Sequence, residues 1–442
     1  MLRIDEVQDS TGFPDKVDVV VIGGGIIGAS TAYELSLKGV SVALLEKGFI
    51  GAEQSGRNWG WVRQQNRNYH ELAMAMRSVE RWAELSVETG IDLGFRRNGI
   101  LYGATNAADL SRWEEWGRGA HAFGFSSEIL TGSEVKARLP GSRAAWAGGV
   151  WSPSDGMAEP RKAAPAIAEG ARRNGVHVYQ TCAVRGLDVS AGRISGVWTE
   201  RGLIRSSMVV CAAGAWSSRL CRQYGIDLPV ANIVGTTMRT SVAPEVISGC
   251  LYGPDFALRR RLDGGYTLAV PGYGRMELAP QGMRYAMKFY KLFRSNLAKK
   301  LKIRVGKSFF NGPEASGSWS MQDRSPFEET RVMDPAPDGE WVQVALKKLI
   351  KTLPELEGIR VVQTWAGLID TTPDLVPVIS TVADLQGLII ASGFSGHGFG
   401  LGPGAGLLTS QMVMNETPFV DVSPFRLTRF TDGTKTKAHE MM

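Results

Sequence analysis

The chain has 442 residues, of which 43% are apolar and 21% are charged, and its formal net charge is +6. This length predicts about two or three domains with sizeable cores, and so small a charge excess gives no support to nucleic-acid binding. The four Cys form no Cys-x-x-Cys pair, and no stretch approaches the ~18 consecutive apolar residues of a membrane span. We therefore expect a cytoplasmic protein without a disulfide scaffold or a metal site.

Three separated stretches of the chain alternate between predicted strands and helices. In chain order the predicted elements are strands at 17–22, 40–45, 176–179, 193–199, 203–212 and 387–391, and helices at 26–37, 160–173 and about 404–414. The shared alternation predicts one α/β Rossmann-like domain, discontinuous in sequence and built on a doubly wound parallel sheet.

The intervening stretches contain short predicted strands punctuated by Pro and Gly, with little α/β alternation. This pattern predicts an α+β domain built on an antiparallel sheet. We assign residues 1–93, 156–230 and 358–442 to the Rossmann-like domain and residues 94–155 and 231–357 to the second domain, which we expect to bind the substrate.

The first strand-to-helix turn carries a Gly-x-Gly-x-x-Gly motif at residues 23–28. Gly23 allows the tight turn, Gly25 lets the backbone approach a pyrophosphate, and Gly28 lets helix and strand pack closely. Glu46 ends the second strand, where its carboxylate can accept hydrogen bonds from an adenosine ribose and would repel a 2′-phosphate. The alternative is a structural Gly turn beside a solvated Glu. The position between a buried strand and a helix favours a dinucleotide site.

Further motifs follow this turn along the chain. They are Val-Val-Cys-Ala-Ala-Gly-Ala-Trp-Ser at 209–217, Trp-Ala-Gly at 365–367 with Thr-Pro-Asp at 372–374, and Ser-Gly-Phe-Ser-Gly-His-Gly-Phe-Gly at 392–400. In this order the motifs resemble those of the D-amino-acid oxidase superfamily, a group of FAD-dependent oxidoreductases that includes glycine oxidase, sarcosine oxidase and the D-amino-acid dehydrogenases. The resemblance spans about residues 17–415 and implies that the Rossmann-like domain binds FAD. The cofactor contacts that it implies are Gly23, Gly25, Ile26, Ile27, Gly28, Glu46, Lys47, Ser55, Gly56, Arg57, Val184, Ala213, Gly214, Trp216, Gly367, Gly393, Gly396, His397, Gly398, Phe399 and Gly400.

The Gly-rich segment before the last helix is suited to stabilise a reduced flavin. Reduction places negative charge near N1 and O2 of the flavin, and backbone N–H groups at a helix N-terminus stabilise such charge. His397 matches a His that lies near the flavin in the sarcosine-oxidase-like members, which implies a catalytic role, although a His between two Gly can also simply hydrogen-bond the loop. Relatives with covalent flavin use a Cys after the Thr-Pro-Asp motif, whereas no Cys here lies beyond position 250, so we expect noncovalent FAD.

The resemblance places residues 55–63 beside the ribityl chain and the isoalloxazine ring. Trp59 and Trp61 are expected to wall the substrate cavity, although one of them can be plain core. Arg57 or Arg63 is expected to face the flavin or a substrate carboxylate. Trp61 and Arg63, with the His described above, are the candidate catalytic residues.

One residue of the family pattern is absent. Glycine oxidase and the dehydrogenases that resemble it carry an Arg shortly after a Gly-Leu pair, which here is Gly367-Leu368 at the end of the Trp-Ala-Gly motif. In those relatives the Arg pairs with the substrate carboxylate. Here Gly367-Leu368 is followed by Ile369 and Asp370. Asp370 either binds a cationic group of the substrate or caps the local turn, and the sequence leaves both open. If a carboxylate is bound, the candidates in the second domain are Arg259, Arg260, Arg261 and Arg324.

Residues 284–307 carry nine Lys or Arg, and no acidic residue lies between Glu277 and Glu314. Apolar side chains are interleaved with these charges at roughly helical spacing. Such a segment is either an ordinary surface helix or a surface that contacts an anionic membrane or docks an electron acceptor. We therefore expect the protein in the cytoplasm, either free or associated with the membrane surface through this segment.

These features predict an FAD-dependent oxidoreductase that oxidises the C–N bond of an amino acid or a related amine. Hydride passes from the carbon next to nitrogen to flavin N5, and the resulting imine hydrolyses. Two alternatives stay open: a dehydrogenase of N-substituted amino acids, such as an N-methyl amino acid or an opine, and an FAD-holding subunit of a heteromeric electron-transfer complex.

The electron acceptor is expected to be oxygen or a quinone or dye. In the sarcosine-oxidase-like relatives a Lys near the flavin promotes the reaction with oxygen, because a positive charge stabilises superoxide. This chain has no Lys between Lys162 and Lys288, and Gly400 stands at the position of a second family Lys. The pattern favours a quinone or dye.

Overall fold

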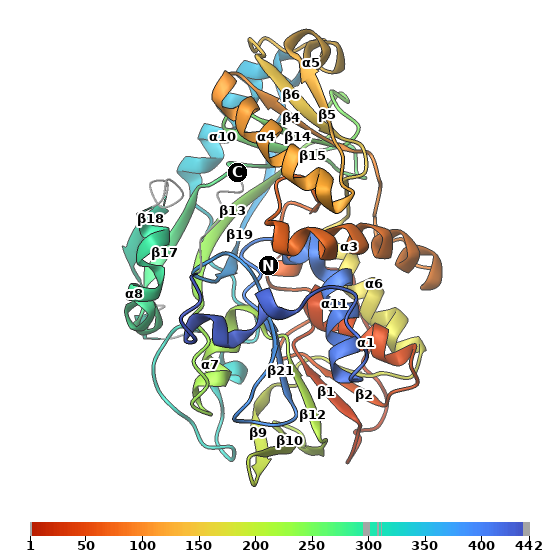
Figure 1. Cartoon of the computed structure of the whole chain (residues 1–442), viewed down its shortest axis with the longest axis vertical. Helices are drawn as coiled ribbons and strands as arrows, with labels where there is room; N and C mark the ends of the chain where they lie inside the picture. The colour runs from red at the N-terminus through yellow and green to blue at the C-terminus, as the bar shows by residue number, and fades with distance from the viewer. Residues whose placement is uncertain (1, 295–300, 307–308, 311, 436–442) are drawn as a thin grey trace.

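The computed structural model describes residues 2–294, 301–306, 309–310 and 312–435. In Figure 1 a largely parallel sheet lies in the lower part of the molecule, and a larger sheet extends from the left side to the top. No helix within these ranges is long and apolar enough to cross a membrane.

The strands of the lower sheet are β1 (Val19–Ile22), β2 (Val42–Leu45), β8 (His177–Tyr179), β12 (Met208–Cys211), β20 (Val378–Thr381) and β21 (Leu388–Ser392). Their order is β20-β21-β12-β1-β2-β8, and all pairs are parallel except β20 with β21. Strands drawn from three distant stretches thus form one sheet, as the alternation of elements predicts. The unbroken apolar sequences of the central strands β1, β2 and β12 fit a parallel sheet that is buried on both faces.

Different helices and strands pack on the two faces of this sheet. The elements involved are the helices α1 (Ile26–Ser36), α3 (Tyr69–Glu88), α6 (Pro160–Arg173), α7 (Ser217–Arg222) and α11 (Gly398–Val413), and the strands β9 (Val184–Ser190), β10 (Arg193–Thr199) and β11 (Gly202–Arg205). Val19 and Val21 of β1 pack with α1, α3, α6 and α11, whereas Val20 and Ile22 pack with α7 and the small antiparallel sheet β9-β10-β11. This follows from the alternation of side chains along a strand.

The larger sheet contains β4 (Ile100–Ala104), β5 (Glu128–Thr131), β6 (Gly148–Ser152), β13 (Ala231–Thr240), β14 (Cys250–Gly253), β15 (Phe256–Arg260), β16 (Tyr266–Ala269), β17 (Gly274–Leu278), β18 (Leu301–Val305) and β19 (Val361–Thr371). It is mainly antiparallel, as predicted, but β4 pairs in parallel with β14 and β17 with β18. The helices of this half are α4 (Ala107–Ala120), α5 (Gly132–Arg138), α8 (Pro280–Phe293) and α10 (Gly339–Thr352). Val342, Ala345 and Leu349 of α10 pack on Leu258 and Leu268 of the sheet.

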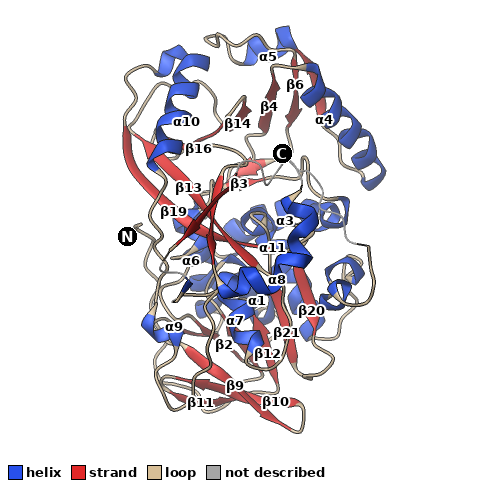
Figure 2. Cartoon of the chain, turned by 90° about the vertical axis from the view of Figure 1, so that its left-hand side faces the viewer, coloured by secondary structure: helices blue, strands red, loops and turns tan. Residues whose placement is uncertain are grey.

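The long strands β13 and β19 run side by side between the two halves of the molecule (Figure 2). β19 belongs to the segment 358–442 that the sequence assigns to the Rossmann-like domain, yet it pairs with β13 along its length. The sequence-based domain boundaries therefore remain a proposal at this point. Shorter elements connect the halves: α2 (Gln54–Arg57), the two-stranded ribbon of β3 (Trp61–Val62) with β7 (Gly156–Met157), and α9 (Pro326–Glu329).

The predictions differ from the structure most clearly at the last helix. We expect a loop up to about residue 404, but α11 begins at Gly398. A Cβ at Gly402 would lie 2.5 Å from the Ile26 side chain, and one at Gly406 would lie 2.4 Å from that of Ser30. These glycines let α11 pack closely on α1, and that packing outweighs the low intrinsic helix propensity of Gly.

Candidate functional site

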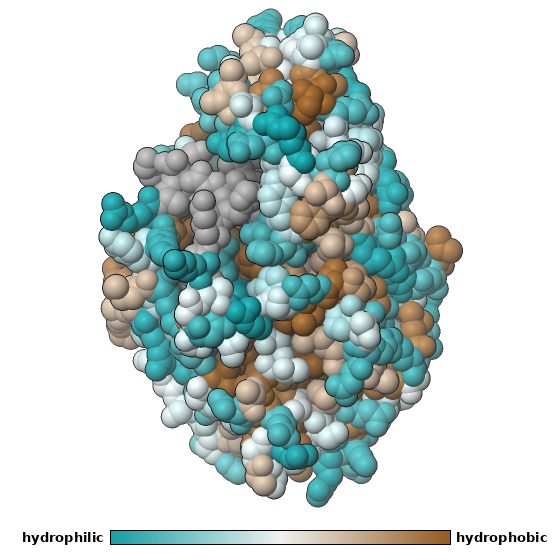
Figure 3. Space-filling model, viewed as in Figure 1, coloured by the Kyte–Doolittle hydropathy of each residue, from teal (hydrophilic) through white to brown (hydrophobic). Residues whose placement is uncertain are grey.

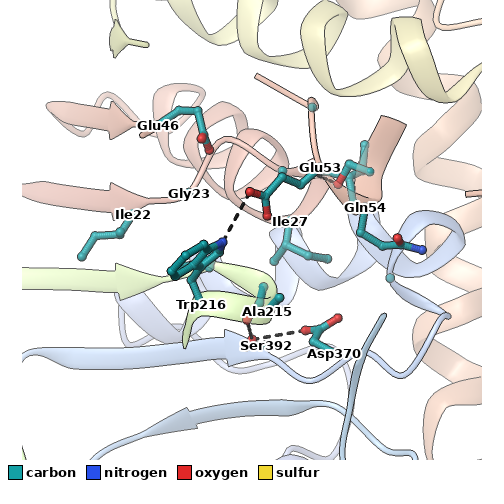
Figure 4. A pocket seen from close by; sticks show the side chains of 18 of the residues that line it. Ile22, Gly23, Ile27, Glu46, Glu53, Gln54, Ala215, Trp216, Asp370 and Ser392 are labelled. Atoms are coloured by element: carbon teal, nitrogen blue, oxygen red, sulfur yellow. Dashed lines mark hydrogen bonds between the residues drawn. The ribbon is translucent and has the colours of Figure 1, made fainter. Parts of the chain in front are cut away.

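A long cavity lies at the carboxyl ends of β1, β2 and β12, the edge at which sheets of this kind bind ligands. Figure 4 shows it at close range. The predicted cofactor contacts that line it are Gly23, Gly25, Ile26, Ile27, Glu46, Lys47, Ser55, Val184, Ala213, Gly214, Trp216, Gly396, Gly398 and Phe399. The fold thus brings together side chains from all three stretches of the Rossmann-like domain.

The turn from β1 to α1 has the geometry that the Gly motif predicts. Gly23 has a φ of 104°, and a Cβ there would lie 2.5 Å from the carbonyl oxygen of Ala212. A Cβ at Gly28 would lie 1.9 Å from the carbonyl oxygen of Gly23. Gly25 has no side chain to cap α1, and the N–H of Ile26 donates to the Ser55 hydroxyl at 2.8 Å. The N-terminus of α1, from Gly25 to Ile27, lines the cavity. A helix N-terminus in this position suits a pyrophosphate.

Glu46 faces the same cavity from the end of β2. Its Oε1 accepts the N–H of Gly48 and its Oε2 the N–H of Gly24, both at 2.7 Å. Burial raises the pKa of this carboxyl, while the Lys47 ammonium and the two N–H donors act in the opposite direction. Because each carboxylate oxygen has two acceptor sites, Glu46 can also accept ribose hydroxyls.

Beside Glu46 the wall is formed by Lys47, Glu53 and Trp216. The Lys47 ammonium pairs with Glu53 at 2.7 Å and lies 4.6 Å from the centroid of the Trp216 ring. The Trp216 indole donates to the same carboxylate at 3.4 Å, as Figure 4 shows. These contacts hold an aromatic face along the cavity.

The other end of the cavity is formed by the start of α11 and by Asp370. The side chain of His397, the residue before α11, does not cap the helix, so its N-terminal N–H groups can stabilise negative charge. Asp370 Oδ2 accepts the N–H of Gly393 at 2.7 Å. It also accepts the hydroxyl of Ser392 at 3.3 Å, the contact drawn in Figure 4. Burial raises the pKa of Asp370 to about 6. Of its two predicted roles, the contacts are those of a turn cap.

A second cavity adjoins the first, and Gln54, Asn58, Gly396 and Phe399 line both. Its walls are formed by strands of the larger sheet, among them β13 and β19, by β3, and by the segments that follow α2 and β21. Its aromatic residues include Trp59, Trp61, Tyr102, Trp113 and Tyr252. The ring centroid of Trp61 lies 6.4 Å from those of Tyr102 and Tyr252, and the latter two are 5.7 Å apart. The structure therefore places both Trp of the predicted segment in one aromatic wall.

Three arginines line this second cavity, and two of them, Arg63 and Arg67, form no ion pair in the described part of the chain. Arg63 was predicted, and its Nη1 donates to the Gln65 carbonyl at 2.9 Å. Arg67 was not predicted; it is 2% exposed, and its Nη1 has no hydrogen-bond partner among the described residues. Burial and the Arg63 cation lower the pKa of Arg67 to about 9. Both cations are therefore available to an anionic group of a ligand.

His397, also predicted, lines the second cavity and contacts a buried carboxylate. Its Nδ1 lies 3.3 Å from Glu71, which is fully buried. Burial lowers the pKa of His397 to about 4, the nearby Arg67 and Arg63 lower it further, and Glu71 opposes the shift. Neither Glu71 nor Arg67 was predicted from the sequence. No local pattern marks these two residues, because Arg67 precedes α3 and the spacing to Glu71 therefore does not place them on one helix face.

Arg57 lines the second cavity but is bound to the protein. Its Nη1 donates to Asp334 at 2.6 Å and to the Ala366 carbonyl at 2.8 Å, and its Nε donates to the Ala52 carbonyl. Its Nη2 is buried without a partner in the described chain. Arg57 therefore ties α2 to β19 and leaves one donor unbonded.

The arginines predicted to bind a substrate carboxylate from the second domain lie outside both cavities. Arg259 pairs with Glu159 at 3.0 Å, and Arg261 pairs with Asp263 at 3.0 Å. Arg324 is exposed and donates to the Glu328 carbonyl, and Arg260 donates to that of Ala243. This corrects the expectation, because these guanidinium groups are bound to other parts of the protein.

Five predicted cofactor glycines also lie behind the walls rather than in them: Gly28, Gly56, Gly367, Gly393 and Gly400. They permit close packing. A Cβ at Gly367 would lie 2.2 Å from Gln54 Oε1, and one at Gly56 would lie 2.5 Å from the Gly51 carbonyl oxygen. Their direct contact with a cofactor is therefore not supported by their placement.

The four Cys are unpaired and buried, and none of them lines either cavity. No thiol is thus placed to bond a flavin. Within the described ranges no group of three His, Cys, Asp or Glu side chains could hold a metal ion.

Comparison with known proteins gives one consistent group. The model of the family DAO, "FAD dependent oxidoreductase", matches residues 18–412. The structure of L-amino acid deaminase from Proteus myxofaciens in complex with anthranilate is similar at 30% identity and a TM-score of 0.92, covering 98% of this chain and 97% of that one.

Two curated relatives extend this group. Human mitochondrial sarcosine dehydrogenase is 27% identical over 95% of this chain, which spans only 42% of that relative. Sarcosine oxidase subunit beta from Arthrobacter sp is 25% identical, covering 94% of this chain and 91% of the relative.

The match fits the first cavity, where the Gly turn, Glu46 and the uncapped start of α11 meet the needs of a flavin dinucleotide. FAD is therefore the cofactor, held noncovalently. The chain belongs to the DAO family of FAD-dependent oxidoreductases.

Proposed function

We propose that the chain oxidises the carbon–nitrogen bond of an α-amino acid or of an N-substituted amino acid. The observation that carries this proposal is the junction of the two cavities at Gly396 and Phe399, with buried cations and an aromatic wall on the far side of the junction. When bound, FAD supplies the hydride acceptor for such a reaction. The protein has to orient the substrate carbon, keep its amine neutral and exclude water.

The substrate carboxylate is assigned to Arg63 and Arg67. Both line the second cavity, both are buried, and neither has a carboxylate hydrogen-bonded to it in the described part of the chain. A planar guanidinium binds a carboxylate through two parallel hydrogen bonds. A ligand carboxylate would also compensate the cost of two neighbouring buried cations.

The substrate side chain is assigned to the aromatic wall of Trp61, Tyr102, Trp113 and Tyr252. These four rings pack against one another, so this part of the cavity favours a large apolar or aromatic side chain, whereas polar residues such as Asn66 and Thr237 line other parts of it. The similar L-amino acid deaminase forms a complex with anthranilate, which combines a ring and a carboxylate. Two similar proteins act on or are named for sarcosine, an N-methyl amino acid, so the N-substituted alternative is retained.

A second candidate function is that of an FAD-holding subunit, because one relative that the chain covers almost fully is named a subunit. Turnover of an amino acid by the isolated chain with an artificial dye separates the two. We expect such turnover. If an amino acid reduces the flavin but turnover requires a second polypeptide, the chain is an FAD-holding subunit instead.

Oxygen is expected to be a poor acceptor. Lys47, at the dinucleotide end, is the one Lys that lines either cavity in the described chain, and Gly400 lies within α11. Without a cation of the family type near the flavin ring, superoxide formation is less stabilised. Stopped-flow oxidation of the reduced protein should give a rate constant for the reaction with oxygen below about 10⁴ M⁻¹s⁻¹. A larger value would show that the protein is an oxidase and not a dehydrogenase.

The basic segment remains a proposal for docking to an anionic membrane, with the protein otherwise cytoplasmic. α8 exposes Met283, Met287 and Tyr290 beside Arg284 and Lys291. Figure 3 shows brown side chains among teal ones at the left edge, where Figure 1 places α8. Residues 295–300 and 307 of the predicted segment lie outside the described ranges.

Replacing Met287 and Lys291 together by Glu should reduce binding to vesicles of phosphatidylserine and phosphatidylcholine by roughly tenfold, since each basic side chain contributes about 1 kcal/mol at such a surface. Co-sedimentation measures this. Lys347→Glu, an exposed cation on α10, serves as the control. Equal binding of all three proteins would identify α8 as an ordinary surface helix.

A further inference from the structure

The contact of His397 with Glu71 orients the imidazole on the wall of the second cavity. Nδ1 of His397 lies 3.3 Å from the Glu71 carboxylate, and the residues come from the start of α11 and the first turn of α3. Glu71 has no measurable exposure, His397 is 4% exposed, and Glu71 Oε2 has no hydrogen-bond partner in the described chain. Among the described residues, His397 is the one basic side chain in hydrogen-bond contact with this buried carboxylate.

This contact selects one tautomer of His397. A carboxylate only accepts hydrogen bonds, so Nδ1 carries the hydrogen and Nε2 keeps its lone pair. Within the described ranges no side chain or backbone group bonds Nε2. Since His397 lines the second cavity, its free lone pair is available to a ligand there.

The charged groups that face His397 are Glu71 of α3 and Arg63 and Arg67 of the segment before α3. Burial and the two cations hold the pKa of the imidazole at about 4, so it is neutral near pH 7 and able to accept a proton. A carboxylate bound to the arginines would offset their charges. Loss of that repulsion raises the pKa of His397 and makes it a stronger base when substrate is bound.

We propose that His397 is the base that takes a proton from the substrate ammonium group and that Glu71 is the positioning residue that orients it. The inference rests on the proposed function, because it needs an amino acid in the second cavity. In this step an N–H bond of the ammonium breaks, its electron pair stays on nitrogen, and the proton bonds to Nε2 of His397. The nitrogen lone pair is then free to assist loss of hydride from the neighbouring carbon, which an ammonium cannot do.

The first test is the pH dependence of anaerobic flavin reduction by an amino acid. His397→Asn should slow reduction near pH 7 by about 10²-fold, and Glu71→Gln by roughly tenfold. Both defects should shrink at alkaline pH, where the substrate amine is already neutral. His70→Asn and Glu80→Gln, exposed positions on α3, are the matched controls. A defect of equal size at every pH would show a merely structural role and overturn the proposal.

The second test needs no turnover. Benzoate, a carboxylate without an amine, is titrated into the FAD-loaded protein by calorimetry in buffers of different ionisation enthalpy, about one unit above the pKa of about 4. Binding should be accompanied by uptake of a proton, which His397→Asn abolishes and Glu71→Gln reduces. Binding with no uptake would reject the base assignment alone. Failure of every amino acid to reduce the wild-type flavin would instead reject the proposed function, and the inference with it.

Discussion

Arg67→Met should lower kcat/KM for an amino acid by about 30-fold or more while leaving the thermal stability unchanged or higher. Loss of one partner from a buried, hydrogen-bonded charge pair costs about 2–5 kcal/mol. In the free protein, however, Arg67 has an unbonded Nη1 and a neighbouring Arg63 cation, so an apolar side chain of similar volume relieves an unfavourable burial. Steady-state kinetics and thermal unfolding of the same FAD-loaded samples measure both effects.

Arg324→Met is the control for this prediction. Arg324 was a sequence-based candidate for the same role, but it is exposed and outside both cavities. Its replacement should leave kcat/KM unchanged. An Arg67→Met protein with normal kcat/KM, or an Arg324→Met protein with a large loss, would show that the carboxylate is bound elsewhere.

Glu46→Ala should weaken FAD binding by about 1.5–3 kcal/mol, the contribution of a hydrogen bond to a charged group. The ribose would lose its acceptor, and the N–H groups of Gly24 and Gly48 would lose theirs. Glu46→Gln retains one acceptor oxygen and should have a smaller effect. Reconstitution of the FAD-free protein, followed by flavin fluorescence, gives the Kd.

Glu80→Gln, on the exposed face of α3, is the control for FAD binding. An unchanged Kd in Glu46→Ala would contradict the assignment of Glu46 to the ribose. A change of equal size in Glu80→Gln would point to a general loss of stability.

The dinucleotide half of the site could be predicted because its determinants are local in sequence. Gly23 and Gly28 are required by the backbone of a single turn, and Glu46 follows from the length of one strand-helix-strand unit. The start of α11 was misplaced for the opposite reason. Its glycines are needed for packing against Ile26 and Ser30, which lie more than 370 residues earlier in the chain.

The substrate half could not be predicted to the same extent, because a charged residue acquires its role from distant neighbours. The Arg run at 259–261 resembles an anion site, but Glu159 neutralises Arg259 across the fold. Arg67 carries no distinctive motif, and only its burial without a bonded carboxylate marks it as a ligand group. Glu71 is likewise distinguished only by its contact with His397.

Anaerobic mixing of the FAD-loaded protein with D-, L- and N-alkyl amino acids tests the central claim most directly. Loss of the oxidised flavin absorbance reports hydride transfer and requires no electron acceptor. We predict full bleaching by at least one amino acid with a large apolar or aromatic side chain, and much slower bleaching of the Arg67→Met protein by that substrate. A flavin that dithionite reduces but that no member of the panel reduces would contradict the proposed oxidation of a carbon–nitrogen bond.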